Sequence, residues 1–293
     1  MFDAFTHTSL EIDKCTIDVM MAGGGPPVLL LHGFPETKAA WHKVAPQLAT
    51  EYTVILPDLP GYGDSTGPKP DAGEECHTKR AYADILVKLM AELGFDTFVV
   101  AGHDRGARVA YRMALDHPEK VSRLAVLNII PTLEVIERLT FETALKMGNW
   151  ILLGQPAPLP ETLIGNNPAF YLENILDSWA EDPEQITPEA RAAYLRCFEK
   201  ASVVAAMCAE YRSNLLDAEY DHEDRNNGRR IQCPTLVLWS EKDDPGGGDN
   251  MLSVWKQWAD NVSGAALPGG HFLMEECPDV TCRQLFTFFN GRS

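Results

Sequence analysis

One aspartate lies where a folded chain could use it as a nucleophile. Asp104 stands between Gly102 and Gly106, after the apolar run Val99–Ala101 and before a segment with helical spacing, 107–115. The two glycines allow a tight turn and let a substrate approach it. A carboxylate at such a turn can attack a saturated carbon and form an alkyl ester on the enzyme. We therefore expect Asp104 to be the catalytic nucleophile.

A histidine late in the chain could act as the base for the second step. His271 follows Pro268, Gly269 and Gly270, just after a short apolar stretch. A neutral imidazole can take a proton from water as that water attacks the ester carbonyl of Asp104. We therefore expect His271 to activate the hydrolytic water.

The group that orients His271 has several candidates. Asn128 directly follows one apolar run and carries no charge, whereas Asp243 and Asp244 follow the next run, 235–239. An acid in this role stabilises the imidazolium that forms during catalysis. We expect Asp243 to fill it, with Asp244 as the next choice. Asn128 could instead orient the ring through its side-chain oxygen, without stabilising the imidazolium.

Further groups near the nucleophile could bind an oxyanion and a substrate. The backbone N–H groups of Phe34 and Arg105 each follow an apolar run, and we expect them to form an oxyanion hole. Arg105 follows the nucleophile directly, and Arg108 lies one helical turn away. The planar guanidinium group suits a carboxylate, so both arginines are expected to bind a small anionic substrate. The alternative is that one or both pair with structural carboxylates.

In two parts of the chain, 1–130 and 228–293, short apolar runs alternate with segments of helical spacing. An antiparallel strand or hairpin is expected over 9–21, and further strands are expected over 27–31, 52–56, 98–101, 123–130, 235–239 and 265–267. The expected helices cover 39–48, 79–93, 107–115, 251–259 and 279–289. This alternation predicts an α/β fold with a mostly parallel sheet flanked by helices. Residues 131–227 have a helical and aromatic pattern, so we expect a core of 1–130 and 228–293 and an inserted helical cap.

Composition narrows the classes of function. The 293 residues carry a net charge of −17, which argues against nucleic acid or an anionic membrane surface as a partner. No stretch of about 20 apolar residues predicts a membrane span, and no signal peptide is expected. The seven scattered cysteines are expected to be reduced thiols of a cytoplasmic protein. No metal site and no cofactor is expected.

Several motifs together resemble the fluoroacetate (haloacetate) dehalogenases of the α/β-hydrolase fold. The motifs are His-Gly-Phe-Pro at 32–35, Asp-Leu-Pro-Gly-Tyr-Gly at 58–63, Gly-His-Asp-Arg-Gly-Ala-Arg at 102–108, Leu-Ala-Val-Leu-Asn-Ile-Ile-Pro-Thr at 124–132, Gln-Pro-Ala-Pro-Leu-Pro at 155–160 and Gly-Gly-His-Phe at 269–272. The resemblance covers nearly the whole chain. It implies an α/β-hydrolase fold, a 2-haloacid as the small anionic substrate, glycolate as the product and a homodimer.

The resemblance also implies a halide pocket in the cap. The family holds the leaving fluoride with a His-Trp pair and a Tyr, and the matching positions are Asn149, Trp150 and Tyr211. Trp179 is expected to line the cap entrance. Two positions depart from the family, because its catalytic Asp falls at Asn128 and its pocket His at Asn149. An Asn amide donates a hydrogen bond but cannot become cationic, so chloroacetate and bromoacetate are expected to react more readily than fluoroacetate.

Two other functions fit parts of the sequence. An epoxide hydrolase would share the Asp and His machinery and would use cap tyrosines to protonate the epoxide, for which Tyr171, Tyr194 and Tyr211 are available. The arginine pair argues against it, because a neutral epoxide needs no such clamp. A non-catalytic ligand-binding protein on the same scaffold would explain the two asparagines at family positions.

Overall fold

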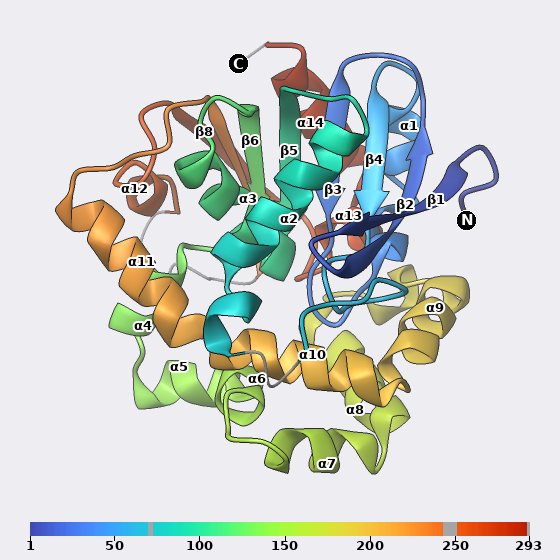
Figure 1. Cartoon of the computed structure of the whole chain (residues 1–293), viewed down its shortest axis with the longest axis vertical. Helices are drawn as coiled ribbons and strands as arrows, with labels where there is room; N and C mark the ends of the chain where they lie inside the picture. The colour runs from blue at the N-terminus through green and yellow to red at the C-terminus, as the bar shows by residue number, and fades with distance from the viewer. Residues whose placement is uncertain (70–72, 243–250, 292–293) are drawn as a thin grey trace.

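The computed structural model describes residues 1–69, 73–242 and 251–291 and contains one eight-stranded sheet (Figure 1). The strands lie in the order β1-β2-β4-β3-β5-β6-β7-β8. Their bounds are β1 (Thr6–Ile12), β2 (Cys15–Ala22), β3 (Pro27–Leu31), β4 (Thr53–Pro57), β5 (Phe98–His103), β6 (Val121–Leu127), β7 (Thr235–Ser240) and β8 (Val262–Leu267). Apolar runs that are buried on both faces form the central strands, as the sequence predicts.

Strand direction divides the sheet into two parts. β1 and β2 form an antiparallel hairpin, and β2 pairs antiparallel with β4. From β4 to β8 every neighbouring pair is parallel. The carboxyl ends of parallel strands share one edge of a sheet, so the loops after β3, β5, β6, β7 and β8 meet there. The α/β-hydrolase fold and its mostly parallel sheet are confirmed.

Helices cover both faces of the sheet. Figure 1 shows α2 and α3 in front of the strands and α1 and α14 behind them. The core helices are η1 (Lys38–Trp41), α1 (Ala45–Leu48), η2 (Glu74–His77), α2 (Lys79–Glu92), α3 (Asp104–Asp116), α12 (Met251–Trp255), α13 (Leu273–Glu276) and α14 (Pro278–Phe289). The single helix expected over 39–48 is wrong. It is two short helices, because Pro46 lacks the N–H group needed in a helix interior and is tolerated in the first turn of the second helix, which begins at Ala45.

The segment between β6 and β7 supplies a layer of helices at one end of the sheet (Figure 1). These helices are α4 (Thr132–Glu137), α5 (Phe141–Lys146), α6 (Gly148–Leu153), α7 (Leu159–Gly165), α8 (Pro168–Trp179), η3 (Pro183–Gln185), α9 (Pro188–Phe198), α10 (Ala201–Arg212) and α11 (Asn214–Asn226). We call this segment the cap. Among the helices of the described ranges, none is long and apolar enough to cross a membrane.

Candidate active site

Asp104 occupies a sharp turn between β5 and α3. Its φ of 46° lies in the left-handed region, which costs a non-glycine residue energy and is found at functional turns. The turn packs tightly, because a Cβ at Gly33 would stand 2.6 Å from the Asp104 Cβ. A Cβ at Gly106 would stand 2.3 Å from the His32 carbonyl oxygen. Glycine is therefore required at both positions to let the loop after β3 approach the nucleophile.

The Asp104 carboxylate is buried among positive groups. Its side chain accepts a hydrogen bond from the Phe34 N–H at 3.0 Å, and its other oxygen lies 3.8 Å from His271 Nε2. Burial alone would raise the pKa of Asp104, but the charges of His271, Arg105, His103 and Arg108 lower it below its ordinary value. The group is therefore ionised at neutral pH, as a nucleophile must be. Phe34 lies where an oxyanion donor is expected, and the Arg105 N–H follows in the first turn of α3.

The backbone of His271 is held at two points. Its N–H donates to the Trp179 carbonyl at 3.0 Å, and its carbonyl accepts from His103 Nε2 at 2.8 Å. The Trp179 indole packs edge-on against the imidazole, with ring centroids 4.9 Å apart. Trp179 thus contacts the expected base directly from the end of α8. These contacts keep the imidazole beside Asp104.

The pair formed by His103 and Glu36 lies beneath His271 and was not expected from the sequence. His103 Nδ1 is 2.9 Å from Glu36 Oε2, and both side chains are fully buried. Burial alone would lower the pKa of His103, but the Glu36 carboxylate raises it above its ordinary value. A charged His103 donates from both ring nitrogens, which matches its bonds to Glu36 and to the His271 carbonyl. The sequence signal is their position: His103 lies within the motif at 102–108, and Glu36 directly follows the motif at 32–35.

Asn128 meets the imidazole with its nitrogen, which corrects the expectation that its oxygen would. Its Oδ1 accepts from the Ser240 N–H at 3.0 Å, and its Nδ2 lies 2.9 Å from His271 Nδ1. The backbone N–H of Ser240 can only donate, so it fixes the oxygen on its own side. An amide N–H facing Nδ1 is a donor, so Asn128 does not offer the ring a hydrogen-bond acceptor at that nitrogen. Asp243 and Asp244, the acids expected here, lie outside the described residues.

Arg105 is largely paired already. Its Nε lies 2.9 Å from both carboxylate oxygens of Glu210, and its Nη2 donates to Glu210 at 2.6 Å and to Asn214 at 2.7 Å. The Tyr211 ring covers one face of the guanidinium group at 4.0 Å. Among the described residues Nη1 has no hydrogen-bond partner, although it is buried. Only one nitrogen of Arg105 therefore remains for the substrate role expected from the sequence.

Arg108 is buried with neutral partners. Its Nη1 donates to the Ile130 carbonyl and to the Thr132 hydroxyl, each at 3.1 Å. Its Nε is buried and meets no acceptor in the part of the chain that the structure describes. Burial and the nearby charge of Arg105 lower the pKa of Arg108 below its ordinary value. A guanidinium group in this state gains from an anion that enters beside it.

The three residues expected in the halide pocket come from two cap helices. Trp150 on α6 stacks near both arginines, with its ring 5.3 Å from the Arg105 Cζ and 4.7 Å from the Arg108 Cζ. Tyr211 on α10 packs edge-on against Trp150 at 6.3 Å. Asn149 accepts from the Tyr171 hydroxyl at 2.6 Å through its oxygen. Its amide nitrogen therefore points away from Tyr171.

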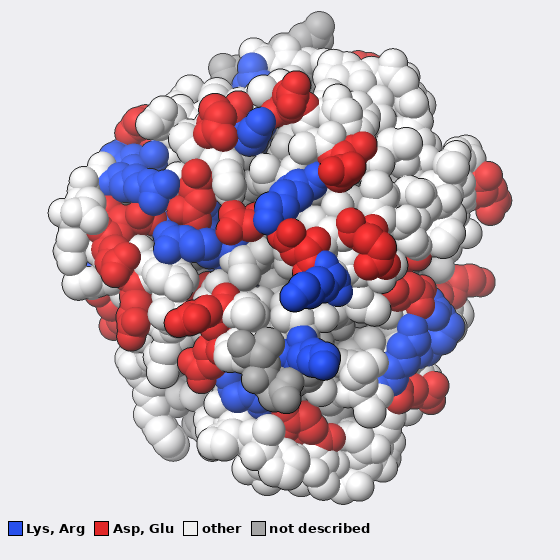
Figure 2. Space-filling model, in the orientation of Figure 1, with Lys and Arg blue, Asp and Glu red and all other residues white. Residues whose placement is uncertain are grey.

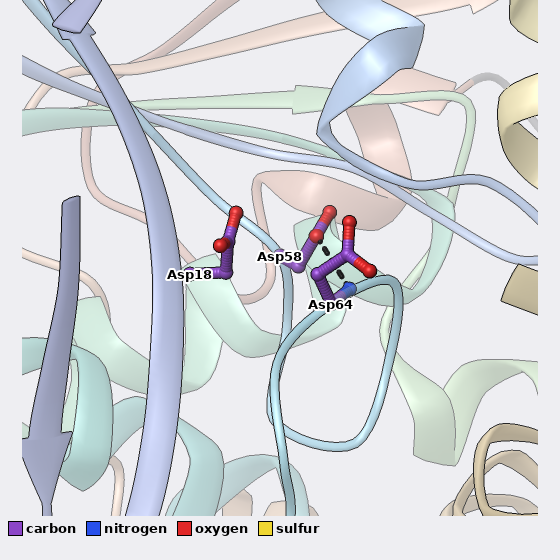
Figure 3. Close-up of side chains that lie close together, drawn as sticks. All are labelled: Asp18, Asp58 and Asp64. Carbon is purple, nitrogen blue, oxygen red and sulfur yellow. Dashed lines mark hydrogen bonds between the residues drawn. The ribbon is translucent and has the colours of Figure 1, made fainter. Parts of the chain in front are cut away.

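One cluster of carboxylates elsewhere has the spacing of metal ligands. Asp18, Asp58 and Asp64 place one oxygen each within 4.8 Å of one another (Figure 3). Cations of the protein already neutralise them, since Lys38 lies 2.6 Å from Asp18 and 2.5 Å from Asp58. Asp64 binds Arg196 and Lys200 of the cap, each at 2.7 Å. The cluster therefore connects the core to the cap through ion pairs.

Comparisons with known proteins agree with this geometry. The family model for the alpha/beta hydrolase fold matches residues 26–278. A fluoroacetate dehalogenase from Burkholderia sp is 39% identical over 99% of this chain and 95% of its own length. A soluble epoxide hydrolase from Corynebacterium sp. (strain C12) is 30% identical over 99% of both chains. The crystal structure of a protein described as an α/β hydrolase, from Nostoc sp PCC 7120, is 44% identical, with a TM-score of 0.96 over 99% of both chains.

Each of these matches extends across both the core and the cap. In this fold the turn that carries Asp104 lies beside His271, with 3.8 Å between Asp104 Oδ2 and His271 Nε2. The resemblance to fluoroacetate dehalogenase extends over nearly the full length, and the chain belongs to the α/β-hydrolase family.

Proposed function

We propose that this hydrolase removes halide from haloacetates and releases glycolate. Asp104 attacks the carbon that bears the halogen, and the carbon–halogen bond breaks with its electron pair leaving on the halide. The product of this step is a glycolate ester of the Asp104 carboxyl. The observation that carries the proposal is a buried carboxylate nucleophile beside Arg108, which has only neutral partners in the described structure.

The second step hydrolyses the ester. Water attacks the Asp104 carbonyl carbon while His271 takes its proton at Nε2. The Phe34 N–H, which donates to Asp104 at 3.0 Å, stabilises the negative charge that develops on that oxygen. The bond between Asp104 and the glycolate oxygen then breaks, and His271 returns the proton to that oxygen. Water and haloacetate thus give glycolate, halide and one proton.

His271 needs a hydrogen-bond acceptor at Nδ1 to leave Nε2 unprotonated. The Asn128 amide nitrogen supplies a donor at that position. We propose that Asp243, three residues after the end of β7, supplies the acceptor by taking the place of the Asn128 amide at Nδ1. Asp244 is the next candidate.

The cap supplies the halide pocket. We propose that the Trp150 indole N–H, the Tyr211 hydroxyl and the Asn149 amide donate to the departing halide. Fluoride is the poorest leaving group among the halides and gains most from a cationic donor, which Asn149 cannot provide. Chloroacetate is therefore expected to react faster than fluoroacetate.

The first test is halide release from fluoroacetate and chloroacetate, with an Asp104→Ala variant as the control. We expect release that falls at least about a thousandfold in the variant. A single turnover in water labelled with heavy oxygen identifies the nucleophile. The label should enter Asp104 and be absent from the first glycolate, because the glycolate oxygen comes from the carboxylate. Label in the first glycolate would mean that water attacks the substrate directly and would contradict the proposal.

Epoxide hydrolysis is the second candidate, supported by the similarity to the Corynebacterium enzyme. The specific observation in its favour is that two cap tyrosines reach the residues expected in the halide pocket. Tyr171 donates to Asn149 at 2.6 Å, and Tyr211 packs against Trp150 at 6.3 Å. An epoxide carries no carboxylate, so this activity would leave Arg108 without a charged partner. Turnover of styrene oxide together with no halide release from either haloacid would favour the epoxide hydrolase.

A further inference from the structure

Glu210 binds Arg105 from a helix of the cap. Glu210 is 1% exposed, and its carboxylate accepts hydrogen bonds from both Nε and Nη2 of the Arg105 guanidinium group. It also lies 2.5 Å from Lys79 Nζ, and Lys79 in turn lies 2.8 Å from Asp217. Burial alone would raise the pKa of Glu210, but Arg105 and Lys79 lower it, so the carboxylate is charged. Arg105, Lys79, Glu210 and Asp217 therefore form two neutral pairs.

The arginine that remains is Arg108. The Trp150 ring lies 5.3 Å from the Arg105 Cζ and 4.7 Å from the Arg108 Cζ, and the charges of both arginines act on Asp104, so the two guanidinium groups lie near each other and near Asp104. Of the nitrogens of these two arginines, Nη1 of Arg105 and Nε of Arg108 are buried and have no hydrogen-bond partner among the described residues. These two N–H groups, together with the charge of Arg108, which has no carboxylate as a hydrogen-bond partner, match one carboxylate. A second carboxylate on the same substrate would be buried without a cation, at a large desolvation cost.

We propose that Glu210 is a specificity-determining residue that restricts this site to acids with a single carboxylate. It removes two of the three Arg105 nitrogens from the substrate and cancels the Arg105 charge. The inference rests on the proposed function, because it assigns the substrate class of the same site. Glu210 does not contact the substrate and acts through Arg105 alone.

Asp217 offers a matched control for Glu210. Both carboxylates are buried, and both bind Lys79, but only Glu210 contacts Arg105. Glu210→Gln and Asp217→Asn each remove one negative charge from the same network. A general loss of stability or charge would affect the two variants alike, whereas a change in selectivity is expected only from Glu210→Gln.

The experiment is a titration of tryptophan fluorescence with acetate and with malonate, two acids that do not react. We expect the wild-type protein to bind acetate and to bind malonate more weakly. In Glu210→Gln the ratio of malonate to acetate affinity should rise about tenfold, which corresponds to about 1.4 kcal/mol of binding free energy. Asp217→Asn should keep the wild-type ratio. Glu210→Asp keeps the charge and should largely keep the wild-type selectivity.

Three results would overturn the inference. They are an unchanged ratio in folded Glu210→Gln, an equal change in Asp217→Asn, and no saturable binding of acetate to the wild-type protein. Circular dichroism and thermal melting establish that each variant is folded, and Glu210→Ala, which also removes the charge, is titrated if Glu210→Gln does not fold. Halide release plays no part in this titration. Acetate binding without halide release would contradict the dehalogenase proposal alone.

Discussion

At the scale of single residues, the Asn128 side chain presents an amide donor to the ring of His271. The Ser240 N–H holds its oxygen, so its nitrogen meets His271 Nδ1. An aspartate at 128 would have two acceptor oxygens and could serve Ser240 and His271 together. The side chain at 128 therefore decides whether an acid elsewhere is needed.

An aspartate at position 128 could accept from both Ser240 and His271, and this predicts that Asn128→Asp rescues the loss of an acid elsewhere. Asp243→Asn should slow ester hydrolysis about a hundredfold, because His271 loses the acceptor that keeps Nε2 unprotonated. The ester on Asp104 should then accumulate and be visible by mass spectrometry. Adding Asn128→Asp to this variant should restore most of the rate. Asp244→Asn serves as the control, and a larger loss in that variant would reassign the acid to Asp244.

Asn149 gives a prediction about the choice of halide. Its oxygen accepts from Tyr171, which leaves its amide nitrogen as the donor. Asn149→His introduces a ring that can become cationic, and it should raise the ratio of kcat/KM for fluoroacetate to that for chloroacetate. A few-fold change or more is expected, since one charge-assisted hydrogen bond is about twice as strong as a neutral one. Tyr171→Phe is the control, because it removes the Asn149 contact without adding a donor cation. An unchanged ratio in Asn149→His would place the halide elsewhere.

The sequence predicts the residues of this site better than their partners. Asp104, His271 and Arg108 follow strands or lie one turn into a helix, so local spacing indicates them. Glu210 lies 105 positions from Arg105, on a helix of the inserted cap, and no periodicity connects the two. A glutamate beside a predicted pocket residue, Tyr211, was the only signal available. Pairing across an insertion depends on how the cap packs, and this packing is a tertiary property.

At the scale of secondary-structure elements, the central strands were the most predictable part. Val28–Leu31 and its neighbours are buried on both faces, so their apolar runs are continuous and short. The short helices were less predictable, because a few turns can be interrupted by one proline, as at Pro46. The expected boundaries of the core and cap at 130 and 228 remain predictions. The structure shows the helices α4 to α11 between β6 and β7.

A buried acid on α11 holds the start of α4 and links these two elements to Arg108. Asp221 accepts from the Tyr111 hydroxyl at 2.8 Å and from the Leu133 N–H at 3.1 Å. The Tyr111 hydroxyl also hydrogen-bonds the Thr132 hydroxyl, and that hydroxyl accepts a hydrogen bond from Arg108 Nη1. Burial raises the pKa of Asp221 to about 6, although Arg112 opposes this shift. The folded protein therefore binds this proton more tightly than the unfolded chain does.

The sign of the pH effect follows from the raised pKa of Asp221. Its contribution to the free energy of unfolding is fully present below the unfolded pKa near 4 and is lost as pH rises through about 6. Between pH 5 and pH 7 the wild-type protein should lose roughly 1 kcal/mol relative to Asp221→Asn, which does not titrate. Urea unfolding of both proteins at the two pH values measures this difference. Tyr111→Phe keeps the carboxyl but removes a hydrogen bond that lowers its pKa, so its pH dependence should persist and move to higher pH. A constant difference between wild type and Asp221→Asn would contradict the assignment.

At the scale of the whole molecule, the charge works against the proposed substrate. Acidic residues exceed basic ones by 42 to 25, which gives a net charge of −17. On the face drawn in Figure 2, acidic and basic side chains are intermingled, so the excess is spread out. A haloacetate anion therefore approaches against a long-range repulsion. Its binding depends on short-range contacts with Arg108 and one nitrogen of Arg105.

Repulsion of this kind is screened by salt. The screening length falls from about 30 Å at 0.01 M to about 8 Å at 0.15 M ionic strength, so the far charges cease to act while the buried contacts persist. We therefore expect kcat/KM for chloroacetate to rise severalfold across this range, mainly through faster association. Sulfate and phosphate salts at matched ionic strength separate screening from inhibition by one particular anion, because screening depends on ionic strength alone. A rate that falls equally in every salt would mean that attraction by the arginines extends into solvent and outweighs the net charge.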